Sequence, residues 1–139
     1  MKYYLAYGSN LNKAQMQRRC PDAVAIGCTK IYGYSLVFRR GFLTIELDKN
    51  GSVPVGIWQI SEADEKRLDR YEGYPKFYRK EVMHINDLPC MVYIMNEGFP
   101  IEKPTDYYFY TVYLGYKDFG MDTAPLKKAY EQAKWGDEK

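Results

Sequence analysis

The chain has 139 residues, which is enough for one domain with a hydrophobic core and too few for two ordinary domains. Its 20 lysines and arginines nearly balance its 18 aspartates and glutamates, which disfavours a nucleic acid or an acidic membrane surface as the partner. No run approaches the roughly 20 apolar residues of a membrane span, and the sequence shows no basic leader with a cleavage site. We therefore expect a cytoplasmic protein, a monomer or a homodimer, that acts on a small molecule.

The cysteines and the histidine argue against several kinds of site. Cys20, Cys28 and Cys90 have no CxxC spacing and His84 is the only histidine, so we expect no disulfide framework, no metal site and no other cofactor. His84 lies in a strand-like run, FYRKEVMHI, and is expected to fill one face of that strand. Without a Ser-His-Asp or Cys-His pair, any catalysis has to depend on carboxylates, tyrosines and backbone groups.

The first predicted element is an apolar strand over residues 2–7, which ends at the turn residues of YGSN. Asn12 is a favourable cap for a helix over residues 13–19, and Pro21 would end that helix. The turn has two interpretations. It is either an ordinary connection between strand and helix, or a loop whose backbone N–H groups bind an anionic group of a ligand.

The middle of the chain predicts strands around one clear helix. KIYGYSLVF and FLTIEL have strand composition, and DKNG is predicted to form a turn that joins FLTIEL to VPVGIWQI as two antiparallel strands. Ser61 and Asp64 make a capping-box-like pair at the start of the helix in SEADEKRLDRYEG, and Gly73 is its expected C-terminal stop. FYRKEVMHI and LPCMVYIM, which NDL separates, predict a second hairpin.

The last part of the chain is predicted to be helical. PTDYYFYTVYLGY contains residue types that favour a strand, but its apolar residues recur at helical spacing, at Phe109, Val112, Tyr113 and Tyr116. The final helix is expected to begin after a cap at Asp122, with Pro125 in its first turn. Together these elements predict an α+β fold in which a small mixed sheet, or partly closed β-barrel, has flanking α-helices and forms a single domain over residues 1–139.

A second stretch of interest, LDRYEGYPKFY, places a carboxylate where a helix ends. Glu72 would lie at the negative end of the helix dipole, which disfavours its ionised form, and the neighbouring aromatic side chains would keep water away. Both effects would raise its pKa towards a value suited to proton transfer near neutral pH. The other interpretation is a solvated glutamate at a helix end.

These residues, in their order, resemble the γ-glutamylcyclotransferase-like family. The resemblance rests on YGSNL followed by LDRYEG, and it extends through MVYIMN to the closing YLGYKDFG. It implies a small mixed β-barrel with flanking helices and an enzyme that needs no cofactor. The spacing in EGYPKFY is a residue shorter than in the animal glutathione-pathway enzymes and suits the short bacterial-type members.

The resemblance also implies the residues of the site. The glutamate that moves protons would be Glu72, and the α-carboxylate of the substrate would bind mainly to backbone N–H groups of the YGSN loop. The substrate-binding residues are then Tyr7, Gly8, Ser9, Asn10, Leu11, Tyr78, Tyr93 and Tyr108. At the last of these positions Tyr108 matches best, and the adjacent Tyr107 is the alternative.

The implied reaction is an internal aminolysis. The α-amine of a γ-glutamyl group attacks its own γ-carbonyl, so that 5-oxoproline and an amino acid or amine are released, with Glu72 as base and then acid. Three alternatives remain open. One is the same chemistry on a γ-glutamylamine or a γ-glutamyl-protected biosynthetic intermediate, and another is a non-catalytic small-molecule binding module with the same pocket. The third is a nucleic-acid surface at Arg39 and Arg40, which the net charge of +2 disfavours.

Overall fold

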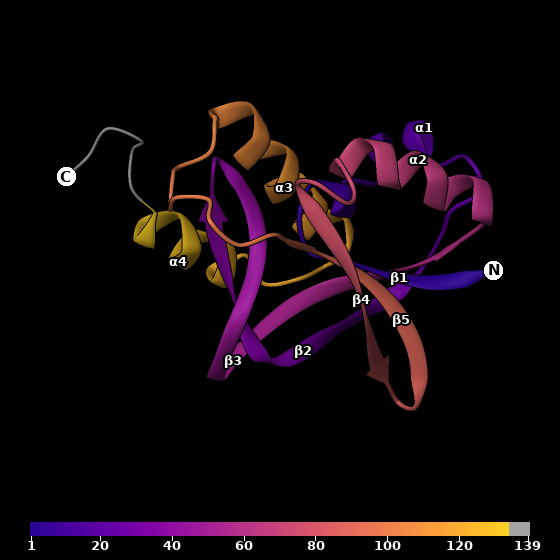
Figure 1. Ribbon diagram of the computed structural model, residues 1–139, viewed down its shortest axis with the longest axis horizontal. Helices are drawn as coiled ribbons and strands as arrows, with labels where there is room; N and C mark the ends of the chain where they lie inside the picture. The colour runs from indigo at the N-terminus through magenta and orange to yellow at the C-terminus, as the bar shows by residue number, and fades with distance from the viewer. Residues whose placement is uncertain (134–139) are drawn as a thin grey trace.

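The strands form one mixed sheet in the computed structural model, which describes residues 1–133 (Figure 1). The strands are β1 (Lys2–Ala6), β2 (Val24–Arg39), β3 (Phe42–Ile60), β4 (Tyr78–Ile85) and β5 (Leu88–Met95). Their order is β2-β3-β1-β5-β4, in which β1 is antiparallel to β3 and parallel to β5. The expected α+β fold with a mixed sheet is confirmed. The sheet is open at β2 and β4, so the term barrel describes it only loosely.

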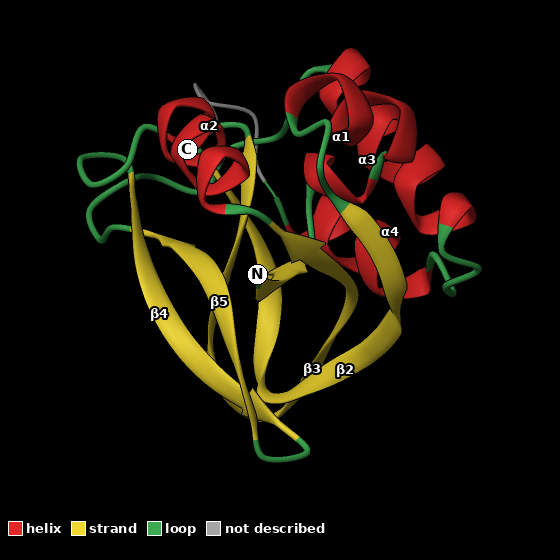
Figure 2. Ribbon diagram, turned by 90° about the vertical axis from the view of Figure 1, so that its right-hand side faces the viewer, coloured by secondary structure: helices red, strands yellow, loops and turns green. Residues whose placement is uncertain are grey.

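The helices gather at one end of this curved sheet (Figure 2). Figure 2 shows α1, α3 and α4 on one side of that end and α2 on the other. None of the helices in residues 1–133 is long and apolar enough to cross a bilayer. They are α1 (Lys13–Arg19), α2 (Glu62–Glu72), α3 (Asp106–Asp118) and α4 (Ala124–Gln132), and a short 3-10 turn, η1 (Ser9–Leu11), precedes α1.

The predicted turn at DKNG is wrong. These residues lie inside β3, which runs without a break from Phe42 to Ile60 and pairs with β2 along most of its length. The register passes from Tyr34↔Leu47 to Tyr32↔Ser52, so the DKNG residues are extra length on β3 and form a bulge. The chain reverses instead at Arg40 and Gly41, where φ is 53° and 81°. Two consecutive positive φ angles suit a tight hairpin turn, and DKNG is left to bend the strand.

The local signals for the helices and the second hairpin are confirmed. Asn12 caps α1 by accepting a hydrogen bond from the Gln15 N–H at 3.1 Å. Both hydrogen bonds of the capping box join Ser61 and Asp64 at the start of α2. The segment at residues 106–118 is helical, and β4 and β5 pair as an antiparallel hairpin. Thr123 occupies the N-cap position of α4 without a side-chain hydrogen bond, and the expected cap, Asp122, one residue earlier, accepts from the Ala124 N–H at 2.9 Å.

Close packing of η1 against α3 fixes the loop that follows β1. Leu11 is completely buried, and its backbone lies against Gly115 on α3. A Cβ added at Gly115 would stand 2.6 Å from the backbone carbon of Leu11 and 2.7 Å from the nitrogen of Asn12. Since backbone atoms have little room to move, only glycine allows this approach. The contact therefore sets the distance between the YGSN loop and α3.

This contact predicts that Gly115→Ala destabilises the protein. Overpacking against backbone costs about 1 to 3 kcal/mol, which exceeds the gain in helix propensity of at most about 1 kcal/mol. Urea unfolding at neutral pH measures the effect. Gly27→Ala is the matched control, because an added Cβ at Gly27 has no atom within 4 Å and should change the free energy of unfolding by about 0.5 kcal/mol or less. Equal unfolding curves for the two variants would contradict the packing argument.

Candidate active site

A cavity of about 370 Å³ opens where the YGSN loop meets the end of α2. Its walls come from β1, η1, β3, α2, β4, β5 and α3, and they include six tyrosines and two phenylalanines. Glu72 is the one charged side chain among the described residues that line it. An aromatic wall around a single carboxylate limits the access of water and strengthens the electrostatic interactions inside the cavity.

The carboxylate of Glu72 lies at the last residue of α2, where Gly73 ends the helix in the left-handed conformation at φ 67°. Burial raises the pKa of Glu72 to about 8, and Arg19 opposes this rise. The direction is the one that its aromatic surroundings predicted. No hydrogen bond or ion pair from residues 1–133 engages this carboxylate. Glu72 is therefore free to exchange a proton with a bound molecule near neutral pH.

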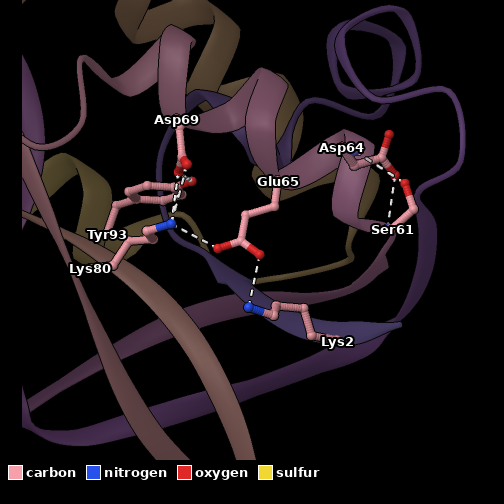
Figure 3. Close-up of polar contacts among 7 residues, drawn as sticks. All are labelled: Lys2, Ser61, Asp64, Glu65, Asp69, Lys80 and Tyr93. Carbon is pink, nitrogen blue, oxygen red and sulfur yellow. Dashed lines mark hydrogen bonds and ion pairs between the residues drawn. The ribbon is translucent and has the colours of Figure 1, made fainter.

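A chain of charged side chains holds α2 against the sheet (Figure 3). Lys80 on β4 lies 2.7 Å from the Glu65 carboxylate and 3.1 Å from Asp69 Oδ1, and Lys2 on β1 lies 2.8 Å from Glu65. Although burial acts to raise it, the hydrogen bonds from Lys2 and Lys80 hold the pKa of Glu65 below its usual range. Tyr93 on β5 donates to Asp69 Oδ1 at 2.6 Å. Asp69 lies one helical turn before Glu72, so these contacts set where α2 ends.

The segment after Glu72 is also fixed. Asn96, which follows β5, donates through Nδ2 to the carbonyl oxygens of Pro75 at 2.8 Å and Lys76 at 2.9 Å. The Phe77 N–H donates to the Gly73 carbonyl at 2.8 Å, and the Phe77 ring lines the cavity. The chain beyond α2 is thus held in the position that completes the cavity wall.

The YGSN loop brings most of its predicted residues to the cavity. Gly8, Ser9 and Asn10 all line it, whereas Leu11 is buried outside the lining and packs against α3. The Ser9 hydroxyl and the Tyr71 hydroxyl share a hydrogen bond of 2.7 Å.

The side chain of Asn10 is fully engaged within the protein. Its Nδ2 donates to the Tyr4 hydroxyl at 2.9 Å, and its Oδ1 accepts from the Arg19 guanidinium. The Arg19 guanidinium lies 3.5 Å from the centroid of the Tyr71 ring, which it covers. The carbonyl oxygen of Asn10 accepts from the indole N–H of Trp58 at 3.0 Å. These contacts tie the loop both to α1 and to the buried core.

The predicted tyrosines line the cavity from three sides. The Tyr7 hydroxyl donates to the Tyr93 carbonyl at 2.6 Å, and the Tyr78 hydroxyl donates to the Leu43 carbonyl at 2.7 Å. The Tyr108 hydroxyl accepts from the Leu43 N–H at 3.2 Å. Together with Tyr93, these tyrosines border the cavity, so the structure brings together residues from β4, β5, α3 and the loop that follows β1.

The orientation of α3 about its axis places the two adjacent tyrosines, Tyr107 and Tyr108, on different faces of the helix. Tyr108 faces the cavity, and a Cβ placed on Gly8 would stand 3.0 Å from its hydroxyl. Tyr107, which lies about 100° away around the helix, is 75% exposed. Tyr108 is therefore the one of the pair that a ligand in the cavity would meet.

His84, Arg39 and Arg40 do not line the cavity. His84 is exposed on β4, Arg39 pairs with Glu46, and Arg40 lies over the rings of Phe77 and Phe99. Within residues 1–133, no group of three histidine, cysteine, aspartate or glutamate side chains is arranged to hold a metal ion.

A model of a protein family, described as γ-glutamyl cyclotransferase, AIG2-like, matches residues 4–111. The chain belongs to this family. No protein among the curated sequences matches it closely enough to count as a relative.

Several solved structures have a similar fold. The chain is similar to a structure titled γ-glutamyl cyclotransferase, with 20% identity and a TM-score of 0.75 over 99% of this chain and 90% of that one. It is similar to the human protein loc79017, with 18% identity and a TM-score of 0.76 over 99% and 90% of the two chains. It is also similar to YkqA from Bacillus subtilis, with 19% identity and a TM-score of 0.76, where it covers 97% of this chain and 56% of that one.

Several residues that line the cavity were not predicted from the sequence. Tyr4, Phe42 and Leu43 line it, although nothing in their local sequence distinguishes them from ordinary core residues. The alternation of side chains along β1 shows that Tyr4 and Tyr3 face opposite sides of the strand. That pattern does not indicate which side faces α2, so Tyr4 could be found only once the sheet order was known.

The half-buried carboxylate of Glu72 predicts an unusual dependence of stability on pH. Because the pKa of Glu72 is about 8 in the folded protein and 4.5 as its ordinary value, the folded state binds the proton more tightly than the unfolded state. Raising the pH through this range therefore costs stability. Relative to Glu72→Gln, the wild type should lose roughly 1 to 3 kcal/mol between pH 5 and pH 9, a range that allows for solvent reaching the cavity.

Urea unfolding of both proteins across this pH range measures the difference. Glu62→Gln, at an exposed position in the first turn of α2, controls for the loss of one negative charge. If the stability curves of the wild type and Glu72→Gln run parallel from pH 5 to pH 9, the carboxylate is not held in a dry cavity.

Proposed function

We propose that the protein is a γ-glutamylcyclotransferase that converts a γ-glutamyl group into 5-oxoproline and releases the amine or amino acid attached to it. The observation that carries the proposal is the position of Glu72, an unpaired carboxylate with a raised pKa, in a cavity beside the YGSN loop. Membership of the AIG2-like family supports the same class of reaction.

In this reaction Glu72 would act as a base and then as an acid. The carboxylate takes a proton from the α-ammonium group, and the free amine attacks its own γ-carbonyl carbon to form a carbon–nitrogen bond. Glu72 then gives the proton to the leaving nitrogen as the original carbon–nitrogen bond breaks. The ring nitrogen gives up its second proton to the released amine, which leaves as an ammonium, so the lactam is neutral and Glu72 is ionised again. One carboxylate can serve both steps because both nitrogens are bonded to the same carbon in the intermediate, and such proton transfer contributes about 10² to 10⁴ in rate.

Positioning would supply a further part of the rate enhancement. The α-carboxylate of the substrate would lie against the loop, where the N–H groups of Gly8 and Asn10 have no acceptor among residues 1–133. Arg19 lies behind the loop and adds positive charge. Holding the carboxylate there directs the adjacent amine towards the γ-carbonyl, and orientation of this kind is worth several kcal/mol.

The proposed function predicts that Glu72→Gln folds and loses activity. An amide cannot shuttle the proton, so the release of 5-oxoproline should fall by about 10² to 10⁴. The measurement is kcat for 5-oxoproline release from a panel that includes γ-glutamyl amino acids, γ-glutamylamines and a γ-glutamyl peptide. Glu62→Gln, which changes the same charge on the same helix, should keep its activity. A folded Glu72→Gln variant with full activity would exclude Glu72 as the proton carrier.

The raised pKa also predicts the pH profile of the reaction. Glu72 has to be ionised to accept the first proton, so kcat/KM should rise with pH and level off above the pKa of about 8. Rates measured between pH 5.5 and pH 9.5 test this expectation. A flat profile from pH 5.5 upward would mean that the carboxylate is already ionised and that burial does not control it.

A binding module is the second candidate, and the cavity itself favours it equally. Such a protein would bind γ-glutamyl compounds without turnover, and its carboxylate would pair with the ligand ammonium group. Calorimetry on the same panel separates the two candidates. Tight binding with no 5-oxoproline formed would support the module and exclude the enzyme.

A further inference from the structure

The tyrosines that line the cavity differ in whether their hydroxyl hydrogen is donated to an acceptor in the protein. A phenol has one hydrogen to donate, and among the tyrosines lining the cavity it goes to a protein acceptor in Tyr7, Tyr78 and Tyr93. Tyr71 shares its hydrogen bond with Ser9. Tyr4 and Tyr108 only accept hydrogen bonds within residues 1–133, from Asn10 and Leu43. The hydroxyl hydrogens of Tyr4 and Tyr108 are therefore left for a ligand.

The hydrogen bond from Asn10 to Tyr4 has a fixed direction. An amide can in principle present either its oxygen or its nitrogen, but a guanidinium can only donate. Arg19 therefore fixes Oδ1 of Asn10 towards itself, and Nδ2 has to face the Tyr4 hydroxyl at 2.9 Å. A phenol oxygen that accepts a hydrogen bond gives its own hydrogen more strongly. Arg19 and Asn10 thus make Tyr4 a better donor.

The two free hydroxyls have different neighbours in the cavity. That of Tyr108 lies beside Gly8, at the loop proposed to hold the α-carboxylate. The ring of Tyr4 packs edge-on against that of Tyr93 with centroids 5.8 Å apart, and Tyr93 is bonded to Asp69 one turn before Glu72. The ring of Tyr4 therefore borders the Glu72 end of the cavity, and its hydroxyl reaches from there to Asn10 of the loop. Burial and then Glu72 raise the pKa of Tyr4, so its hydroxyl stays protonated when Glu72 ionises.

The chemistry of ring closure needs a donor at that end. As the α-amine adds to the γ-carbonyl, the carbonyl oxygen becomes negative on the same carbon that carries both nitrogens served by Glu72. A hydrogen-bond donor aimed at this oxygen stabilises the transition state more than the ground state. The donor has to lie next to Glu72, and it has to keep its own proton while Glu72 shuttles another.

We propose that Tyr4 is a catalytic residue whose hydroxyl donates a hydrogen bond to the γ-carbonyl oxygen of the substrate as negative charge develops there. The proton stays on Tyr4 throughout, and Arg19 and Asn10 act as positioning residues that orient and polarise the hydroxyl. This inference rests on the proposed cyclotransferase function and names the group that stabilises the oxyanion.

The test compares Tyr4→Phe with the wild type on the γ-glutamyl compound that the wild type turns over fastest. We expect kcat to fall by about 10²-fold, the usual cost of one oxyanion donor, with KM changed by less than about threefold. The rise of the rate near pH 8 should remain in place, because Glu72 keeps its surroundings. Tyr108→Phe should instead raise KM, since the Tyr108 hydroxyl lies beside Gly8, in the loop proposed to bind the α-carboxylate of the substrate.

Two further variants separate catalysis from folding. Tyr116→Phe is the matched control, because Tyr116 is buried in α3 outside the cavity and its hydroxyl has no partner in the described part of the chain, so kcat should not change. Arg19→Gln should lower kcat about tenfold, since it removes the charge that polarises Asn10. Circular dichroism shows whether Tyr4→Phe folds. If it does not fold, Arg19→Gln still tests the proposal, because Arg19 acts on Tyr4 through Asn10, and full activity of Arg19→Gln would overturn it.

The outcomes distinguish this inference from the proposed function. Loss of kcat in Tyr4→Phe with the pH profile retained supports the role of Tyr4. A wild type that is active, with Tyr4→Phe within threefold of it, overturns the role of Tyr4 and leaves the cyclotransferase function standing. A shift of the pH profile by a full unit would show that Tyr4 acts through Glu72 and would also overturn it. A wild type that releases no 5-oxoproline from any compound of the panel overturns both.

Discussion

The carboxylate of Glu72 has no partner in the described part of the chain, so its position in the aromatic cavity depends on groups that hold its backbone in place. The most important of these groups is the ammonium group of Lys80. The ammonium group of Lys80 contacts Glu65 and Asp69, two acidic residues on successive turns of α2. Exposed ion pairs add little to stability, but these are partly buried and cross from strand to helix. Their main effect is therefore geometric. They fix the angle and the end point of α2, and the position of the proposed proton carrier follows from both.

The cavity is lined mainly by aromatic rings, several of which carry hydroxyl groups, and by one charged side chain, which suits the proposed substrate. A γ-glutamyl group carries an ammonium and a carboxylate close together, and its reacting end passes through a further negative charge. Glu72, the backbone of the loop and Arg19 behind it account for the first two charges. Neutral hydroxyls would stabilise the third charge, the negative charge that develops on the γ-carbonyl oxygen. A fixed cation at that position would also pair with Glu72 and hold the pKa of Glu72 down. The tyrosines thus combine water exclusion with hydrogen bonding, which neither phenylalanine nor lysine could do.

The sequence predicted those parts of the structure whose signals are local. The caps at Asn12 and Ser61 and the stop at Gly73 depend on neighbouring residues, so α1 and α2 were bounded correctly. The turn at DKNG failed because its residues suit both a hairpin and a bulge, and the choice depends on the long pairing with β2. To choose Tyr108 over Tyr107, one has to know which face of α3 points to the cavity. To identify Tyr4, one has to know which strands lie beside β1. The carboxylate could be singled out from its sequence context, whereas its hydrogen-bonding partners come from segments far apart in the chain.

Asn10 connects an outer helix to the centre of the cavity, and this has a consequence for how the site varies. Trp58 holds the backbone of Asn10, so its side chain has no freedom to find other partners. We therefore expect positions 4, 10 and 19 to vary together, so that a relative that replaces the arginine on α1 also replaces the asparagine or the tyrosine. Covariation among these three positions across the family would be the evolutionary trace of one hydrogen-bonded chain, and it would distinguish members that share this oxyanion donor from members that have replaced it.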